Sequence, residues 1–371
     1  MVRPVWAEID LSAIADNMQA IKSWVTPKTE IMAVVKANAY GHGAVEVART
    51  CMANGASRLA VAIVAEGIEL RNNGFSAPIL VMGYTPPEQC QLLLDYNLTQ
   101  TVFSLEQAKI ISKLAAAAKK TIQIHLKVDT GMGRLGFLEH QLEELVSATK
   151  LPGLQVEGVF THFATADEAD KSYTLAQLNL FNRQLTELDK IGLKPPIVHA
   201  ANSAGIIQYP DSHFNLVRPG LMLYGMYPSN QVDQNNVSIR PAMSFKAKVA
   251  HVKKVAKDTS ISYGCTYQAP KNSVIATLPL GYADGYSRLL SNKGKVLING
   301  HLARVVGRVC MDQIIVDVTQ IPDVKVGAEV VLFGYSSEGH WLPIEEIAAL
   351  AGTINYELVC KVSYRVPRIY I

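Results

Sequence analysis

The stretch that decides the fold is TIQIHLKVDTGMGRLGF, residues 121–137. Its first half alternates strictly, with apolar side chains at the even positions of 122–128 and polar ones at the odd positions of 123–129. A period of two residues predicts a β-strand with one apolar face. In a barrel, such a strand packs its apolar face on surrounding helices and turns its polar face into the lumen. Charged groups buried there require partners or a modification.

Seven other strand-like runs alternate with amphipathic segments up to about residue 230. Eight βα units over this length predict an α/β fold, a (β/α)8 TIM-type barrel. A doubly wound open sheet is the alternative, but no G-x-G-x-x-G follows the first strand. The predicted strands are Ile31–Lys36, Arg58–Ile63, Pro78–Met82, Gln100–Ser104, Thr121–Asp129, Leu154–Thr161, Ile197–Ala201 and Phe214–Arg218.

The pattern changes beyond residue 240. AMSFKAKVAHVKKV (242–255) alternates with a period of two, and KVLINGHLARVVG (295–307) has two strands around Asn299-Gly300, a strong hairpin signal. GAEVVLFG (327–334) predicts another strand, and PIEEIAALAG (343–352) a helix. We therefore expect a barrel over residues 1–235, followed by a mostly β C-terminal domain over residues 236–371.

Composition excludes several classes of protein. The 371 residues are 49% apolar with a net charge of +3, and no Lys/Arg run stands out, so neither disorder nor nucleic-acid binding is indicated. No apolar run approaches the roughly 18 residues of a membrane span, and the N-terminus lacks a signal peptide. These features predict a cytoplasmic protein. No CxxC pair occurs, so no metal site or disulfide framework is expected; the scattered cysteines are Cys51, Cys90, Cys265, Cys310 and Cys360.

Polar residues gather where the predicted strands end, which in barrel enzymes is the rim that carries the active site. Each one alone has an ordinary structural explanation, such as a lysine that reaches solvent or a histidine satisfied in the core. Their coincidence at one rim favours a site. Two of these residues end their predicted strands, Lys36 in strand one and Arg218 in strand eight. The others follow a strand: Arg134 after strand five, His162 after strand six, Asn202 and Ser203 after strand seven, and Gly220 after strand eight.

A lysine and a phosphate site on one rim suggest pyridoxal 5'-phosphate, which binds covalently to a lysine. Loops after strands seven and eight are the usual phosphate site, so Ser203 and Gly220 are candidates. Arg218 is the candidate partner of the pyridine nitrogen. Because arginine keeps its proton, that nitrogen would stay unprotonated. The resulting weak electron sink suits a reaction that must avoid decarboxylation and transamination.

Ten ordered motifs carry a family resemblance across essentially the whole chain. Together they resemble bacterial alanine racemase, although any one of them alone would be weak. The motifs are AVVKANAYGHG (33–43), DTGMGRLGF (129–137), THFATAD (161–167), HAANSAG (199–205), VRPGLMLYG (217–225), SYGCTY (262–267), GYADG (281–285), GRVCMDQ (307–313), GTINYE (352–357) and RVPR (365–368).

The resemblance implies a role for each matching residue. Lys36 carries the cofactor and acts as one base, and Tyr263 acts as the second. Arg134 and Met311 bind the substrate carboxylate, and Lys127 matches a lysine that is often carbamylated in this family. The implied cofactor-binding residues are Lys36, Tyr40, His162, Asn202, Ser203, Arg218, Gly220 and Tyr356. The residues resembling a substrate access corridor are Asp167, Tyr282, Arg288 and Arg308.

The resemblance also implies a head-to-tail homodimer in which Tyr263 and Met311 reach the partner's site. The expected activity is two-base interconversion of L- and D-alanine, supplying D-alanine for peptidoglycan. A serine or broad-specificity racemase on the same scaffold remains an alternative. A non-catalytic pyridoxal phosphate carrier and a barrel decarboxylase are weaker ones. The added β domain with Tyr263 argues against the carrier, and Arg218 in place of a carboxylate argues against the decarboxylase.

Overall fold

The computed structural model describes residues 3–371, which form two compact units. The barrel unit comprises residues 13–39 and 44–240. The C-terminal unit comprises 241–371 together with the segment up to Ser12 and the short stretch 40–43. None of the helices within the described residues combines the length and apolarity that crossing a lipid bilayer requires.

The barrel unit contains one sheet of eight parallel strands in the order β8-β7-β6-β5-β4-β3-β2-β9. The Arg218 N–H donates to the Ala201 carbonyl over 3.0 Å, which joins the ends of β9 and β8 and closes the sheet. The predicted barrel is therefore confirmed, with all eight strands in place. Their bounds are β2 (Glu30–Val34), β3 (Arg58–Val61), β4 (Ile79–Val81), β5 (Thr99–Val102), β6 (Ile122–Lys127), β7 (Leu154–Phe160), β8 (Ile197–His199) and β9 (Leu216–Val217).

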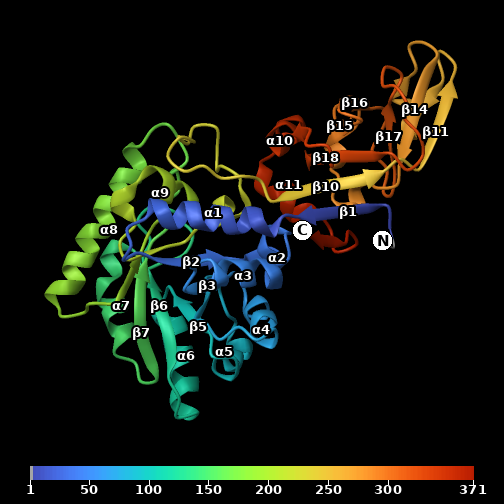
Figure 1. Cartoon of the computed structure of the whole chain (residues 1–371). Helices are drawn as coiled ribbons and strands as arrows, with labels where there is room; N and C mark the ends of the chain where they lie inside the picture. The colour runs from blue at the N-terminus through green and yellow to red at the C-terminus, as the bar shows by residue number, and fades with distance from the viewer. Residues whose placement is uncertain (1–2) are drawn as a thin grey trace. The chain divides into compact units, whose positions relative to one another are not determined.

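Helices surround these strands (Figure 1). The first buries Ile14, Met18 and Ile21, the apolar stripe expected of an amphipathic helix. Ser104 caps another by accepting the Gln107 N–H over 3.2 Å. The helices are α1 (Leu11–Trp24), α3 (Ala44–Ala53), α4 (Val64–Asn72), α5 (Cys90–Asp95), α6 (Leu105–Ala117), α7 (Leu142–Thr149), α8 (Ser172–Lys190) and α9 (Ser203–Gln208).

The C-terminal unit is mostly β, as expected. Its main sheet runs β11-β14-β17-β16-β15-β18-β10-β1-β20. Asn299 and Gly300 join β15 to β16 with φ of 48° and 75°, as a two-residue hairpin turn requires. The bounds are β1 (Val5–Ile9), β10 (Met243–Lys248), β11 (His251–Val255), β14 (Ser273–Leu278), β15 (Lys295–Ile298), β16 (His301–Val305), β17 (Ile314–Asp317), β18 (Glu329–Tyr335), β20 (Arg368–Tyr370), α10 (Ile344–Ala351) and α11 (Asn355–Lys361).

One strand of this sheet comes from the other end of the chain. β1 pairs antiparallel with β10 and parallel with β20, so it is an interior strand of the C-terminal unit. Analysis of the sequence did not assign the N-terminal segment to this unit, because its pairing partners lie more than 200 residues away.

Candidate active site

Lys36 lies at the start of a left-handed turn. Strand β2 ends at Val34, two residues earlier than predicted, and α2 (Lys36–Tyr40) follows with Ala37, Asn38 and Ala39 at φ of 52–53°. L-residues in this conformation cost roughly 1–2 kcal/mol each. Such strain persists only where neighbouring groups over-determine the backbone, and it concentrates at functional sites.

Glu66 of α4 supplies that constraint. Its carboxylate accepts the Ala37 N–H over 2.6 Å and the Ala62 N–H over 2.7 Å, which ties the end of β3 to the turn after Lys36. No sequence pattern indicates this role, because an acidic residue in the first turn of a helix is common.

Replacement of Glu66 by Gln should lower the free energy of unfolding by about 1 kcal/mol. The two carboxylate oxygens accept the N–H groups of Ala37, Ala62 and Ile63, and glutamine replaces one of these oxygens with an NH2 donor. Urea unfolding of both proteins measures the difference. Glu69→Gln, on the exposed face of the same helix, is the matched control and should unfold like wild type. Equal effects of the two substitutions would show that Glu66 does not hold the turn.

Four basic residues lie around His162 at the rim of the barrel. Burial, and then the positive charges of Arg218, Lys127, Arg134 and Lys36, hold the pKa of His162 well below its usual range. The imidazole is therefore neutral, and the four predicted cationic residues all lie near enough to act on it. A cleft lined by one sign of charge concentrates ligands of the opposite sign. The arrangement suits an anionic cofactor and a carboxylate substrate.

Arg218 is 3% exposed and held from several sides. Its guanidinium donates to the carbonyls of Thr161 and Ala200 over 2.9 and 2.8 Å, and to Nδ1 of His199 over 2.8 Å. A longer contact of 3.3 Å joins it to Nδ1 of His162. Burial lowers the pKa of Arg218 to about 9, which leaves it a fixed cation at neutral pH.

Lys127 is 4% exposed at the end of β6, on the lumen side as the alternation predicts. Its Nζ lies 4.6 Å from the centroid of the Phe160 ring. Burial, reinforced by the charges of Arg218 and Arg134, lowers the pKa of Lys127 to about 7. A large fraction of this amine is therefore uncharged at neutral pH, which makes it a nucleophile.

The loop after β6 presents Arg134. The Asp129 carboxylate accepts the N–H groups of Gly131 and Gly133 over 2.9 and 3.1 Å, which folds the loop back on itself. Gly131 has φ of +133°, and a Cβ there would lie 2.7 Å from the Tyr173 hydroxyl. Glycine is required at this position for both reasons, and the resulting turn leaves Arg134 exposed.

The loops after β8 and β9 meet at the proposed phosphate ligands. Asn202 caps α9 by accepting the Gly205 N–H over 2.9 Å. The Ser203 hydroxyl oxygen accepts the N–H groups of Gly220 and Met222 over 3.0 and 3.3 Å. The structure therefore brings Ser203 and Gly220 together, although they come from different strands.

The C-terminal unit holds the remaining predicted site residues. Tyr40 packs beside Tyr356 with ring centroids 6.2 Å apart, and burial raises the pKa of Tyr40. Tyr263 is 71% exposed and Met311 52% exposed. Of the corridor candidates, Tyr282, Arg288 and Arg308 lie in this unit, while Asp167 lies in the barrel unit.

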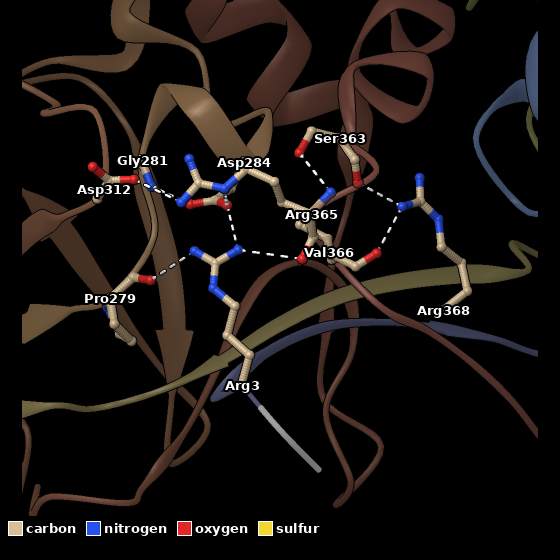
Figure 2. A network of polar contacts seen from close by, with 9 residues as sticks. All are labelled: Arg3, Pro279, Gly281, Asp284, Asp312, Ser363, Arg365, Val366 and Arg368. Atoms are coloured by element: carbon tan, nitrogen blue, oxygen red, sulfur yellow. Dashed lines mark hydrogen bonds and ion pairs between the residues drawn. The ribbon is translucent and has the colours of Figure 1, made fainter.

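Two segments of this unit meet beside Met311. The Ala283 N–H donates to the Met311 carbonyl over 3.1 Å. A Cβ on Gly281 would lie 2.4 Å from that carbonyl oxygen, so only glycine allows the approach. Figure 2 shows how the turn is fixed: buried Asp284 accepts the Gly281 N–H and pairs with Arg3, and Arg365 reaches Asp312 over 2.7 Å.

The same network explains two of the recognised motifs. GYADG provides the glycine and the buried aspartate, and RVPR provides an arginine that contacts the residue after Met311. These motif positions therefore hold a backbone segment in place.

Comparison with known proteins gives a consistent family. Residues 9–228 match the family described as alanine racemase, N-terminal domain, and residues 242–370 match alanine racemase, C-terminal domain. An alanine racemase of Desulforamulus reducens is 54% identical over 373 residues, covering 100% of both chains. One from Methanococcus maripaludis is 52% identical over 370 residues, covering 99% of each.

Solved structures agree. The alanine racemase of Clostridium difficile 630 has a TM-score of 0.95 and 45% identity, covering 100% of this chain and 96% of that one. The alanine racemase of Bacillus anthracis with bound L-Ala-P has a TM-score of 0.95 and 41% identity, and the match covers 100% of this chain and 96% of that one. With both domains matched and the relatives spanning its full length, the chain belongs to the alanine racemase family of amino acid racemases, which are isomerases.

Proposed function

We propose that this chain interconverts L- and D-alanine with pyridoxal 5'-phosphate as its cofactor. The observation that carries the proposal is the set of basic residues around neutral His162, namely Arg218, Arg134, Lys127 and Lys36. This donor set suits a phosphate group and a substrate carboxylate at one rim. The Bacillus anthracis relative has been solved with bound L-Ala-P.

The residues present fit pyridoxal phosphate. When bound, this cofactor supplies an electron sink that makes the Cα–H bond of an amino acid acidic. Lys36 would hold it covalently, and Ser203, Gly220, Tyr40 and Tyr356 would hold its phosphate, with Asn202 fixing the helix end. Arg218, kept cationic and braced by His162, would face the pyridine nitrogen and leave it unprotonated.

Racemisation requires a proton to leave one face of Cα and return to the other. Two bases on opposite faces remove the need for one base to swing around the substrate. We assign the D-alanine proton to Lys36 and the L-alanine proton to Tyr263. Arg134 and the backbone N–H of Met311 would bind the carboxylate.

We further propose a homodimer in which Tyr263 and Met311 complete the partner's site. Both side chains are more than half exposed in the single chain. A base that works at a dry site needs a cover, and exposed aromatic and thioether side chains are typical of interfaces. We also propose that the protein is cytoplasmic and that it supplies D-alanine for peptidoglycan. We place the boundary between its two domains at residues 235/236.

The activity is tested by incubating the holoenzyme with a panel of L-amino acids and detecting the D-isomers with a D-amino acid oxidase. L-Alanine should give the highest kcat/KM in the panel. A higher value for L-serine, or similar values for several substrates, would favour the broad-specificity alternative. No D-isomer from any substrate would reject racemisation.

Lys127 should carry a carbamate above about pH 7, because its lowered pKa leaves the amine uncharged there. Neutral Nζ attacks the carbon of CO2, a C–N bond forms, and the nitrogen releases a proton to leave an N-carboxylate. Below about pH 6 the amine is mostly protonated and the carbamate is lost. The new negative charge would face Arg134 and Arg218, whose charges act on Lys127 in the structure.

Carbon-13 NMR in labelled bicarbonate measures this modification. We expect a carbamate signal at about pH 8 that disappears at about pH 6 and is absent from Lys127→Ala. A signal that survives in Lys127→Ala comes from another amine and would reject the assignment.

A further inference from the structure

A continuous series of side-chain contacts leads from Arg218 through the barrel lumen. Nη1 of Arg218 lies 2.8 Å from Nδ1 of His199, and Nε2 of His199 lies 2.8 Å from Nδ1 of His125. Nε2 of His125 lies 3.2 Å from Oε2 of Glu157, whose Oε1 accepts Nη1 of Arg58 over 2.7 Å. We call the set Arg218, His199, His125 and Glu157 the lumen relay.

The relay reaches from the active-site rim toward the opposite end of the barrel. His199 ends β8, whereas Arg58 begins β3 and pairs with Glu30 at the start of β2 over 3.1 Å. In parallel barrels the strand starts lie at the face away from the active site. Glu157 therefore connects the site to a face that takes no part in the chemistry.

The proton positions along the relay follow from donor chemistry. Arginine only donates, so Nδ1 of His199 must accept. Burial and nearby cations hold the pKa values of His199 and His125 below their usual range, so both rings are neutral. A neutral ring that accepts at one nitrogen donates at the other. His199 therefore donates from Nε2 to Nδ1 of His125, and His125 donates from Nε2 to Glu157.

Glu157 suits its place as the final acceptor. Burial alone would raise the pKa of its carboxyl, but hydrogen bonds from His125 and Arg58 lower it to about 2. The group is therefore an anion with two acceptor oxygens, each taken by one donor. The lumen relay has three hydrogen bonds from Arg218 to Glu157, and Arg58 donates a fourth to Glu157. In each of the four a donor faces an acceptor.

The packing reserves space for this relay. A Cβ on Gly158 would lie 2.7 Å from Nδ1 of His125, so the residue after Glu157 must be glycine for the ring to fit. The His199 ring stacks on Phe160 with centroids 4.6 Å apart and an interplanar angle of 7°. The rings of His125 and His199 are fully buried and have little freedom to reorient.

From this geometry we infer that Glu157 is a positioning residue for Arg218. As the terminal acceptor it orders the protons of both histidines, so that His199 presents a lone pair, and not an N–H, to the guanidinium. Reversal of the order would place N–H against N–H at Arg218 inside the barrel. The inference rests on the proposed function, in which Arg218 faces the cofactor.

The test compares Glu157→Gln with Glu157→Met, which are similar in size and both uncharged. Both lose the ion pair with Arg58, but only glutamine keeps an acceptor for His125. We expect Glu157→Gln to retain both Nε2–H tautomers. Glu157→Met should show mixed tautomers at His125 and His199, read by nitrogen-15 NMR of histidine-labelled protein.

The kinetic readout separates positioning from substrate binding. Because the relay acts on Arg218 and not on the carboxylate site, kcat of Glu157→Met should fall about tenfold while KM for alanine stays near wild type. Glu157→Gln should stay within about threefold of wild type in both constants. Arg58→Met, which keeps the Glu157 carboxylate and removes the ion pairs of Arg58 with Glu157 and Glu30, should retain the tautomers and kcat.

Three results would overturn the inference: unchanged tautomers in Glu157→Met, equal loss of kcat in the Gln and Met variants, or an Arg58→Met variant as impaired as Glu157→Met. If Glu157→Met does not fold, the other two variants still test the inference. Both must keep the Nε2–H tautomers of His125 and His199, and loss of these tautomers in either variant would overturn it. The NMR readout needs no racemase activity. A failure of the protein to racemise alanine would therefore reject the proposed function, while the NMR result would still test the proton order in the lumen relay.

Discussion

Replacement of Lys36 by Ala should reduce alanine racemisation by at least about a thousandfold, because one side chain both holds the cofactor and moves a proton. The absorbance of the lysine-bound cofactor should also be lost. Borohydride reduction followed by peptide mass spectrometry should find the cofactor on residue 36 of wild type and on no peptide of the variant.

Lys28→Ala is the matched control, since Lys28 is an exposed lysine in the loop before β2. It should keep both activity and label. A covalently trapped cofactor in folded Lys36→Ala would assign the anchor to another lysine and remove the basis for Lys36 as a base.

Replacement of Tyr263 by Phe should lower racemisation in both directions by about 10²–10⁴-fold, because each turnover needs both bases. In this variant, the exchange of the Cα proton with D2O should differ between the two isomers of alanine. D-Alanine should still exchange, since Lys36 takes its proton, whereas L-alanine should not. Proton NMR of the two isomers in D2O measures this directly.

Mixing of the two inactive variants tests whether the site is shared. Each hybrid dimer would have one site with neither substitution, so random exchange of subunits should restore up to about a quarter of wild-type activity. Each variant exchanged with itself is the control. Absence of recovery after verified subunit exchange would argue that Lys36 and Tyr263 act from the same chain.

Periodic patterns in the sequence predicted the strands well. The alternation over residues 122–129 placed His125 and Lys127 in the lumen, and both are buried there. The Asn299-Gly300 turn and the Ser104 cap are equally local signals, and both are present. Local signals succeed where the residue type and its backbone geometry are directly coupled.

Other features depend on distant partners and left no pattern. The left-handed turn after Lys36 uses Ala37, Asn38 and Ala39, not glycine, because Glu66 in another βα unit holds it. Glu157 and His199 meet through His125, but the three residues lie on different strands. Only the closed barrel brings them together, so no local pattern in the sequence predicts their connection.

The place of β1 has a consequence for biosynthesis. Residues 5–9 are synthesised long before their two neighbours in the sheet, which are β10 at residues 243–248 and β20 at residues 368–370. The nascent C-terminal unit therefore cannot complete its sheet until β20 has left the ribosome, and β1 lacks its sheet partners until β10 and β20 have been made. Long-range pairing of this kind slows folding and invites aggregation. We expect the nascent chain to depend on chaperones that cover strand edges during this interval.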